Sequence, residues 1–541
     1  MTTITFYSYK GGVGRSLAVA NVAKYLARFG QRVFAIDFDL EAPGLHYKFA
    51  LDGANGIAQI KQGVVDYISA FRASGRTPDS LSDYVVRVEG PDKESSSGRI
   101  WLMPAGSVPS ASYWRHLAQI SWHDLFYSDS APGVPLFLEL KQQIEQQFKP
   151  DFLLIDARTG ITEIGGVATT VLPEKLVCLL MKNRENLDGA REVLRSIKRV
   201  PKLPGQPDIE VVPVLTRIPE ISEAGREQEV IAQVRDFLNE PAPDLSMTLN
   251  IDQVFVLHSE PGLELAEALR IGGEMSAAQS PLLRDYLRLF SRLVPREVIE
   301  PYVVPLVRDA LGRSFDDPSA AEKDLQVLID YSGHVEAYRG LLNLYRERRP
   351  GEALRTAEAL WRAGGGVHDA VSWYVVQKWF PGMSKNYRVQ RAGKLSIELD
   401  IVAEMWRSAG ANDVEVGLEL AEAFASGKDF KAAAGILQRL LENAGSVPQE
   451  ALVVRYLQLL LQSSDLQAAV FAVEQYGHAF RESADFLREM ARVIIQSGSK
   501  MALANFLDRG EFRVDLLKDR DPVVYSELLA CAGRQSESEK S

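Results

Sequence analysis

Residues 7–16 read Tyr-Ser-Tyr-Lys-Gly-Gly-Val-Gly-Arg-Ser, and this stretch decides the fold of the first half of the chain. The apolar run before it predicts a strand, and the alanine-rich run 17–27 after it predicts a helix. Strand, glycine loop and helix in that order are the layout of a phosphate-binding P-loop. The glycines let backbone N–H groups approach a phosphate, and the helix N-terminus adds partial positive charge.

Apolar strands alternate with helices over residues 1–298. We expect strands at 4–7, 31–37, 98–104, 152–156, 176–180, 209–215 and 253–257, and helices at 16–29, 135–148, 187–198 and 280–293. Continuously apolar strands that alternate with helices predict a mostly parallel sheet covered on both faces. The predicted fold class is therefore α/β, with residues 1–298 forming a P-loop NTPase domain.

The pattern changes to helices alone in the second half. We expect a connector over 299–333 that contains up to one helix, an all-α domain over 334–535 and a flexible tail at 536–541. Turns between paired helices are predicted at 349–354, 427–433, 464–469 and 499–504, and the last three recur every 34–36 residues. This period resembles that of tetratricopeptide repeats, and an irregular helical bundle is the alternative.

Three acids stand at predicted strand ends, which is where open α/β sheets bind ligands: Asp37, Asp39 and Asp156. Ser16 stands where a P-loop hydroxyl ligates Mg²⁺. One acid at a strand end is often only a strand stop, but three together with a P-loop favour a metal–phosphate site.

The Lys-Gly-Gly-Val-Gly segment resembles the deviant P-loop of the ParA/MinD family of dimeric ATPases, and Arg15 resembles its arginine variant. The resemblance covers roughly residues 1–295 and implies ATP and Mg²⁺ as cofactors. It implies that Lys10 reaches the nucleotide of a partner copy, that Asp39 positions the attacking water, and that Arg15 helps to neutralise phosphate charge. The remaining residues implied to bind the nucleotide are Gly11, Gly12, Val13, Gly14, Ser16, Leu17, Gly160, Arg217 and Pro261.

The resemblance also implies a metal site formed by Ser16, Asp37 and Asp156, with Asp156 as the Walker B aspartate. Arg217 and Pro261 follow the last two predicted strands, where the family places the adenine pocket, but the asparagine often found there is absent. Residues 157–159 read Ala-Arg-Thr, which departs from the common Thr-Pro-Pro. Arg158 is either a phosphate-sensing switch residue or a salt-bridge former.

Composition limits the classes of partner. The net charge of −11 disfavours nucleic acid. The two cysteines are far apart in sequence, which excludes a disulfide framework and suits a cytoplasmic protein, and no run of 18 apolar residues predicts a membrane span. Residues 370–397 combine lysine and arginine with aromatic side chains and contain no acid. They could bind single-stranded nucleic acid, bind a protein partner, or serve only the packing of the helices.

The sequence thus predicts a Mg²⁺-dependent ATPase with slow turnover. ATP would hold two copies together as a homodimer, and the helical repeats would recruit protein partners, as in bacterial regulatory or defence systems. One alternative is a ParA-like ATPase that positions DNA or cargo. Another is a scaffold that binds a nucleotide without hydrolysing it.

Overall fold

The computed structural model describes residues 1–51, 59–88, 98–108, 110–200, 208–220, 225–265, 268–272, 276–277, 279–390, 395–443, 449–498 and 513–538. The chain divides into two compact units. The first contains residues 1–306 and 326–332, and the second contains residues 307–325 and 333–541.

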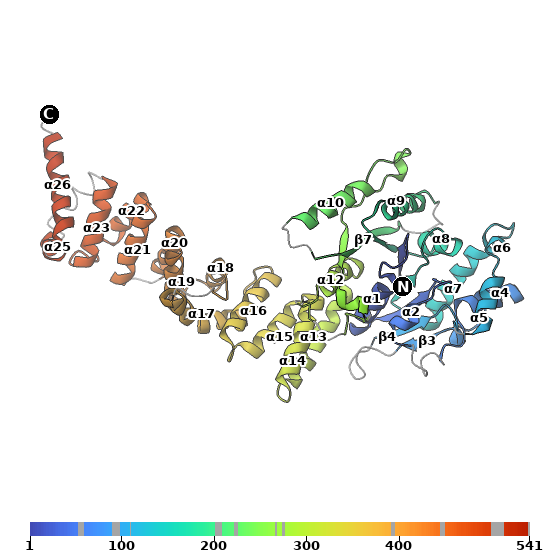
Figure 1. The fold of residues 1–541 in the computed structure, drawn as a ribbon. Helices are drawn as coiled ribbons and strands as arrows, with labels where there is room; N and C mark the ends of the chain where they lie inside the picture. Colours follow the sequence, from blue (N-terminus) through green and yellow to red (C-terminus); the bar gives the residue numbers. More distant parts are fainter. Residues whose placement is uncertain are drawn as a thin grey trace. The chain divides into compact units, whose positions relative to one another are not determined.

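The first unit is built on one mostly parallel sheet with the P-loop NTPase fold (Figure 1). In the part of the chain that the structure describes, the sheet has eight strands in the order β3-β4-β2-β5-β1-β6-β7-β8. Their bounds are β1 Thr2–Ser8, β2 Arg32–Asp37, β3 Val86–Val88, β4 Arg99–Met103, β5 Phe152–Asp156, β6 Lys175–Leu180, β7 Glu210–Ile218 and β8 Phe255–His258. The strands expected from the sequence are all present. The strand that was not expected is β3, which has three residues and pairs antiparallel with β4.

Helices cover the sheet on both faces. All five residues of β5 are buried, and because successive side chains point to opposite faces of a strand, neither face of the sheet is open there. The helices of this unit are α1 Arg15–Arg28, α2 Leu45–Lys48, α4 Val64–Ser74, α5 Ala111–Gln119, α6 Trp122–Phe126, α7 Gly133–Phe148, α8 Glu163–Thr170, α9 Arg184–Arg199, α10 Arg226–Leu238, α11 Pro261–Leu265 and α12 Pro281–Leu293, with short 3-10 turns η1 Ser82–Tyr84 and η2 Leu245–Met247.

The segment expected to be a connector with up to one helix contains two. They are α13 Arg296–Arg313 and α14 Pro318–Ser332, and the division between the two units runs through both. Two prolines within α13, Pro301 and Pro305, are exposed, whereas Val303, Val307 and Ala310 are buried at helical spacing. Burial of this apolar stripe outweighs the hydrogen bonds that the prolines remove, which is why the prolines mark no break.

The second unit consists of helices that follow one another in pairs (Figure 1). They are α15 Val335–Tyr345, α16 Pro350–Ala363, α17 Ala370–Gln390, α18 Leu399–Ser408, α19 Val414–Ser426, α20 Phe430–Asn443, α21 Glu450–Gln462, α22 Leu466–Tyr476, α23 Ala484–Ser497, α25 Val514–Arg520 and α26 Pro522–Ser538. The predicted turns at 349–354, 427–433 and 464–469 each separate two helices, and the turn at 499–504 lies outside the described residues.

Left-handed residues mark the turns of this unit at a regular interval. Lys428, Ser464 and Gly498 have φ values of 67°, 61° and 62° and lie 36 and 34 residues apart. The region is therefore all-α with a repeating turn, and its likeness to tetratricopeptide repeats stays a prediction. Among the described residues, no helix combines the length and the apolar character that a membrane crossing requires.

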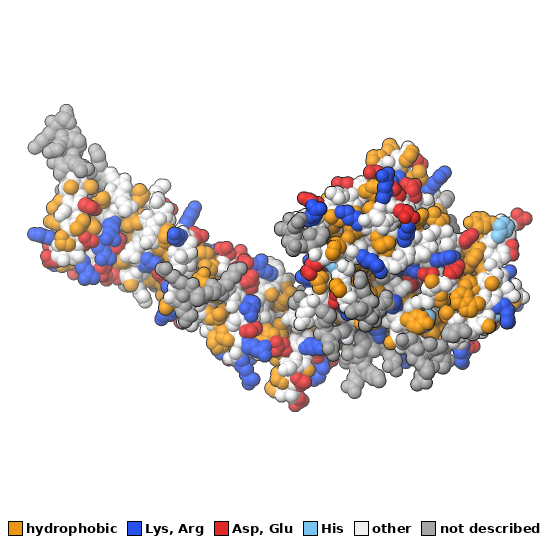
Figure 2. All heavy atoms as spheres, in the orientation of Figure 1, with side chains coloured by type: hydrophobic (Ala, Val, Ile, Leu, Met, Phe, Trp, Pro, Cys, Tyr) orange, Lys and Arg blue, Asp and Glu red, His pale blue; other side chains and the backbone are white. Residues whose placement is uncertain are grey.

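Residues 391–394 lie outside the described residues, and several basic and aromatic side chains of 370–389 contact neighbouring helices. Lys378 pairs with Glu347, Arg388 Nη2 donates to Glu419 Oε2 at 2.5 Å, and Trp379 Nε1 donates to the carbonyl of Arg346 at 2.8 Å. Phe380 is fully buried. These contacts favour the packing role among the three alternatives. In Figure 2 basic and acidic side chains are interspersed over this unit, as such pairing requires.

Candidate functional site

The P-loop joins β1 to α1 at the centre of the sheet. Gly12 and Gly14 have φ values of +74° and +85°, a conformation that side chains rarely adopt, and Gly14 is the N-cap of α1. Gly11, Gly12 and Gly14 are exposed, whereas Val13 is buried. The exposed loop and the unpaired N–H groups of the first turn of α1 form a surface suited to an anion.

Two of the predicted carboxylates lie side by side at the carboxyl end of the sheet. Asp37 ends β2 and Asp156 ends β5, and the two residues are register partners in neighbouring parallel strands. Asp37 accepts backbone N–H groups of the following loop, from Asp39 at 3.1 Å, Gly44 at 3.2 Å and Leu45 at 3.1 Å. Burial raises the pKa of Asp37, and the neighbouring Asp156 carboxylate raises it further.

Arg15 connects these acids. Its Nε donates to Asp156 Oδ1 at 2.5 Å, its Nη2 donates to Asp39 Oδ2 at 2.5 Å, and its Nη1 donates to Ser8 Oγ at 3.3 Å. The side chain is only 7% exposed. Burial opposes its positive charge, but the carboxylates of Asp156 and Asp39 outweigh this and raise the Arg15 pKa. The sequence assigned this cation to phosphate, and in the structure it holds two acids together.

One observation indicates that the residues at the carboxyl end of the sheet could hold a magnesium ion. Asp156 is fully buried, and its Oδ2 has no hydrogen-bond partner among the described residues. A buried carboxylate oxygen without a donor is costly unless a cation or water satisfies it, and carboxylate oxygens suit Mg²⁺. Asp37 differs because backbone N–H groups already occupy both of its oxygens. Asp156 is thus the stronger of the two predicted ligands, and Ser16 lies half-buried at the start of α1.

Further contacts fix the loops around these acids. Arg158 pairs with Glu41 after β2, which favours the salt-bridge role among the two left open by the sequence. Burial raises the pKa of Glu41, and the Arg158 guanidinium opposes this. Tyr7 Oη donates to the carbonyl of Gly160 at 3.1 Å, and Tyr113 Oη donates to the carbonyl of Leu40. Loop 157–160 is thus tied to β1, and the loop that contains Leu40 is tied to α5.

The remaining predicted site residues lie on the β6–β8 side. Lys10 is partly exposed and pairs with Glu185 in the first turn of α9. Arg217, near the end of β7, has its Nη2 3.8 Å from the position that a Cβ would take on Gly12. Pro261 begins α11 and is exposed. The structure therefore brings Arg217 to the P-loop.

Sequence reasoning missed one cluster close to these residues. His258 ends β8, and its Nδ1 lies 2.7 Å from Asp285 Oδ2 while its Nε2 lies 2.9 Å from Glu227 Oε2. Burial lowers the His258 pKa, but the hydrogen bonds and charges of Asp285 and Glu227 outweigh this and raise it. The sequence shows only a lone histidine here, and the cluster could not be predicted because its partners lie 27 and 31 residues away along the chain.

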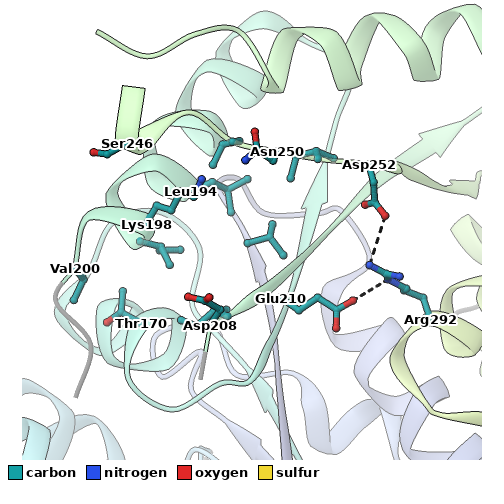
Figure 3. Close-up of a pocket in the computed structure, with 15 residues that line it drawn as sticks. Thr170, Leu194, Lys198, Val200, Asp208, Glu210, Ser246, Asn250, Asp252 and Arg292 are labelled. Atoms are coloured by element: carbon teal, nitrogen blue, oxygen red, sulfur yellow. Dashed lines mark ion pairs between the residues drawn. The ribbon is translucent and has the colours of Figure 1, made fainter. Parts of the chain in front are cut away.

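A cavity of about 660 Å³ lies at the other end of β7 and contains none of the predicted site residues (Figure 3). Leu194 and Ile251 contribute to its apolar lining, and Arg292 pairs with Glu210 at 2.8 Å and Asp252 at 3.7 Å. It borders the start of β7, whereas parallel sheets bind ligands beyond the carboxyl ends of their strands. This cavity is separate from the P-loop site.

Residues 4–234 match the family model described as the CobQ/CobB/MinD/ParA nucleotide binding domain. The match covers fewer than half of the 541 residues, so this segment is similar to that family, and the fold that it shares with the family is that of a P-loop NTPase. The match ends before β8, and no curated protein matches the chain.

Several solved structures resemble the first unit at low identity. The MinC:MinD cell division protein complex of Aquifex aeolicus is 18% identical, with a TM-score of 0.36 and coverage of 55% of this chain and 98% of that one. MinD with Mg-ADP from Pyrococcus horikoshii OT3 is 16% identical, with a TM-score of 0.35 and coverage of 53% and 95%. A complex of Cyanothece McdA with ATP is 16% identical, with a TM-score of 0.36 and coverage of 54% and 95%.

Proposed function

We propose that this protein is a Mg²⁺-dependent ATP-binding switch with slow hydrolysis, whose helical unit recruits protein partners. The observation that carries the proposal is the arrangement at the carboxyl end of the sheet. A left-handed glycine loop faces solvent beside two neighbouring strand-end carboxylates, and one of these has a buried oxygen without a donor among the described residues. The family description of residues 4–234 as a nucleotide-binding domain supports the same conclusion.

In this proposal the P-loop backbone from Gly11 to Leu17 holds the phosphates. Ser16, Asp37 and Asp156 would hold the magnesium ion, which supplies positive charge where the leaving phosphate becomes negative. Gly160 would face the terminal phosphate. Its loop is already tied to the P-loop strand through the hydrogen bond from Tyr7 to its carbonyl.

Slow hydrolysis follows from the contacts of Asp39. Its Oδ2 accepts from Arg15 at 2.5 Å, and burial raises the Asp39 pKa although Arg15 opposes this. A carboxylate that orients water must present a free oxygen to it. The ion pair with Arg15 occupies Oδ2 and stabilises the charged carboxylate, which makes Asp39 a weaker base and would slow turnover while the pair persists. If the pair never opens, the protein is a scaffold that binds ATP without hydrolysing it.

Dimerisation is assigned to Lys10. In the structure its ammonium group pairs with Glu185, whose side chain is 73% exposed. A partly exposed surface pair of this kind has little net stability, so a phosphate on a second copy can replace Glu185 as the partner of Lys10. ATP would then hold two copies together, and hydrolysis would release them.

The oligomeric state under different nucleotides tests the switch. Light scattering on the full chain with Mg·ATP should give a dimer, and Mg·ADP or no nucleotide should give a monomer. Lys10→Ala should stay monomeric with Mg·ATP while still binding it. A wild-type protein that binds Mg·ATP and stays monomeric at every concentration contradicts the switch.

Phosphate release separates the enzyme from the scaffold. Asp39→Ala should release phosphate at least about 100-fold more slowly than wild type, since general-base groups contribute about that factor. Glu419→Ala, which removes a partly buried ion pair with Arg388 in the helical unit, is the control and should release phosphate at the wild-type rate. Equal rates in wild type and Asp39→Ala would mean that Asp39 does not position the water.

A further inference from the structure

Arg217 lies in an unusual backbone conformation near the end of β7. Its φ is +58°, in the left-handed region that costs a residue with a Cβ roughly 1–2 kcal/mol. The pairing of β7 with β8 shifts register between Thr216 and Ile218, so Arg217 is the extra residue of a bulge. Bulges of this kind re-aim a side chain.

Hydrogen bonds fix the bulge on both sides. Thr216 Oγ1 donates to the carbonyl of Leu180 in β6 at 3.1 Å, and Ser259 N donates to the carbonyl of Ile218 at 2.8 Å. Thr216 and Ile218 are buried, whereas Arg217 between them is exposed. The neighbours thus hold Arg217 in its strained conformation, and strain held in this way concentrates at functional sites.

The bulge directs Arg217 toward the P-loop. Its Nη2 lies 3.8 Å from the position of a Cβ on Gly12, so the guanidinium lies against the exposed side of this glycine. Among the described residues no carboxylate forms an ion pair with Arg217. A guanidinium is a strong donor to phosphate oxygens, and it can donate two hydrogen bonds at once.

The other two cations of the loop are already paired. Arg15 is bound to Asp39 and Asp156, and Lys10 is paired with Glu185. A cation in the same copy of the chain strengthens polyphosphate binding, and Arg15 can supply its charge only by leaving two carboxylates. Arg217 forms no ion pair with a described residue, so it can bind a phosphate without first breaking one.

We propose that Arg217 contacts the phosphates of the bound nucleotide from the Gly12 side of the P-loop. This proposal rests on the proposed function and changes one part of it, because the sequence placed Arg217 in the adenine pocket. A phosphate contact does not depend on the base. Arg217 therefore strengthens the binding of any polyphosphate at the P-loop and contributes nothing to the choice between adenine and guanine.

The test compares Arg217→Gly with Lys149→Gly in the full chain. Lys149 also has a positive φ, 48°, but it follows α7 and precedes β5, at the opposite end of the sheet from the P-loop. Glycine removes the charge and relieves the backbone in both variants, so both should melt at or above the wild-type temperature. Isothermal titration would measure the binding of Mg·ATP, Mg·GTP and magnesium tripolyphosphate.

We expect Arg217→Gly to weaken the binding of all three probes about tenfold or more, because one charge-assisted contact is lost. Lys149→Gly should bind as wild type does, and Arg217→Lys should recover part of the loss. Unchanged affinity in Arg217→Gly overturns the proposal, as does a loss for Mg·ATP without a loss for tripolyphosphate. Failure of the proposed function is distinguishable, because wild type would then bind none of the probes.

Discussion

Two buried charge networks, one in each unit, are built differently. In the first unit, Arg15 pairs with Asp39 and Asp156, and Asp37 lies beside Asp156. Asp156 Oδ2 accepts no hydrogen bond from any described residue. Glu489 in α23 is equally buried, at 1% exposed, but both of its oxygens have donors. A complete network needs nothing more than the folded chain, whereas the incomplete one favours a bound cation. This contrast separates the candidate site from structural ion pairs.

Arg15→Ala should have the largest effect on stability. It leaves Asp39 and Asp156 without their cation in a buried place, and breaking a buried ion pair in this way costs about 3–5 kcal/mol. Chemical denaturation of the first unit would measure this. Arg15→Lys should lose less because the charge remains. Arg455→Ala removes a partly exposed ion pair with Glu422 and serves for comparison. A smaller loss of unfolding free energy in Arg15→Ala than in Arg455→Ala would contradict the buried network.

Glu489→Ala should destabilise the helical unit less, by about 1–3 kcal/mol, because a buried hydrogen-bonded group is removed. Its partners Arg488 and Arg492 are 25% and 42% exposed and also contact Asp485 and Asp521, so they are not left without partners. Thermal melting followed by circular dichroism would measure the change. Nucleotide binding should stay at the wild-type level, and a loss of binding would mean that the networks are not separate in function.

His258 gives the first unit a pH-dependent contact between β8, α10 and α12. Its raised pKa means that the folded state binds the proton more tightly than the unfolded state. The resulting stabilisation is fully present below the ordinary histidine pKa of about 6.5 and is lost as pH rises through the raised value. Asp285 and Glu227 contact the ring, and Arg288 lies near Asp285.

Melting temperatures from about pH 5.5 upward through and beyond the ordinary histidine pKa would measure this effect in wild type and in His258→Gln. The wild type should lose stability as pH rises through the raised His258 pKa, and the variant should show a flatter profile. Identical profiles would mean that His258 does not titrate as its contacts indicate.

Arg455→Ala should have the smallest effect. Arg455 donates to Glu422 at 2.7 and 2.9 Å, but both side chains are about one third exposed. Pairs of this kind contribute below about 1 kcal/mol, and salt screens them. The change in unfolding free energy should shrink further at high salt. An effect as large as that of Glu489→Ala would remove the distinction between surface and buried pairs.

The sheet was predictable because apolar runs of strand length are a local signal. The short strand β3 was not, since three residues carry no period, and two helices replaced the expected connector because packing of Val303 and Val307 outweighs the prolines. The positions of Asp37 and Asp156 at strand ends were predictable from the apolar runs that precede them, and their role in a site stays a prediction. The contacts of Arg15 were not, because Asp156 lies 141 residues away and only the folded sheet brings it close.

Arg217 shows the same limit. The sequence placed it near the nucleotide, but the bulge that turns it toward Gly12 depends on hydrogen bonds to β6 and to the residue after β8. Register shifts arise from pairing between strands, and no pattern within one strand predicts them.

Isothermal titration of the full chain with ATP, with and without magnesium, tests the central claim most directly. The account predicts that wild type binds ATP, that magnesium strengthens binding, and that Asp156→Asn loses the magnesium effect while remaining folded. Absence of ATP binding with magnesium present, or equal binding in wild type and Asp156→Asn at every magnesium concentration, would contradict it.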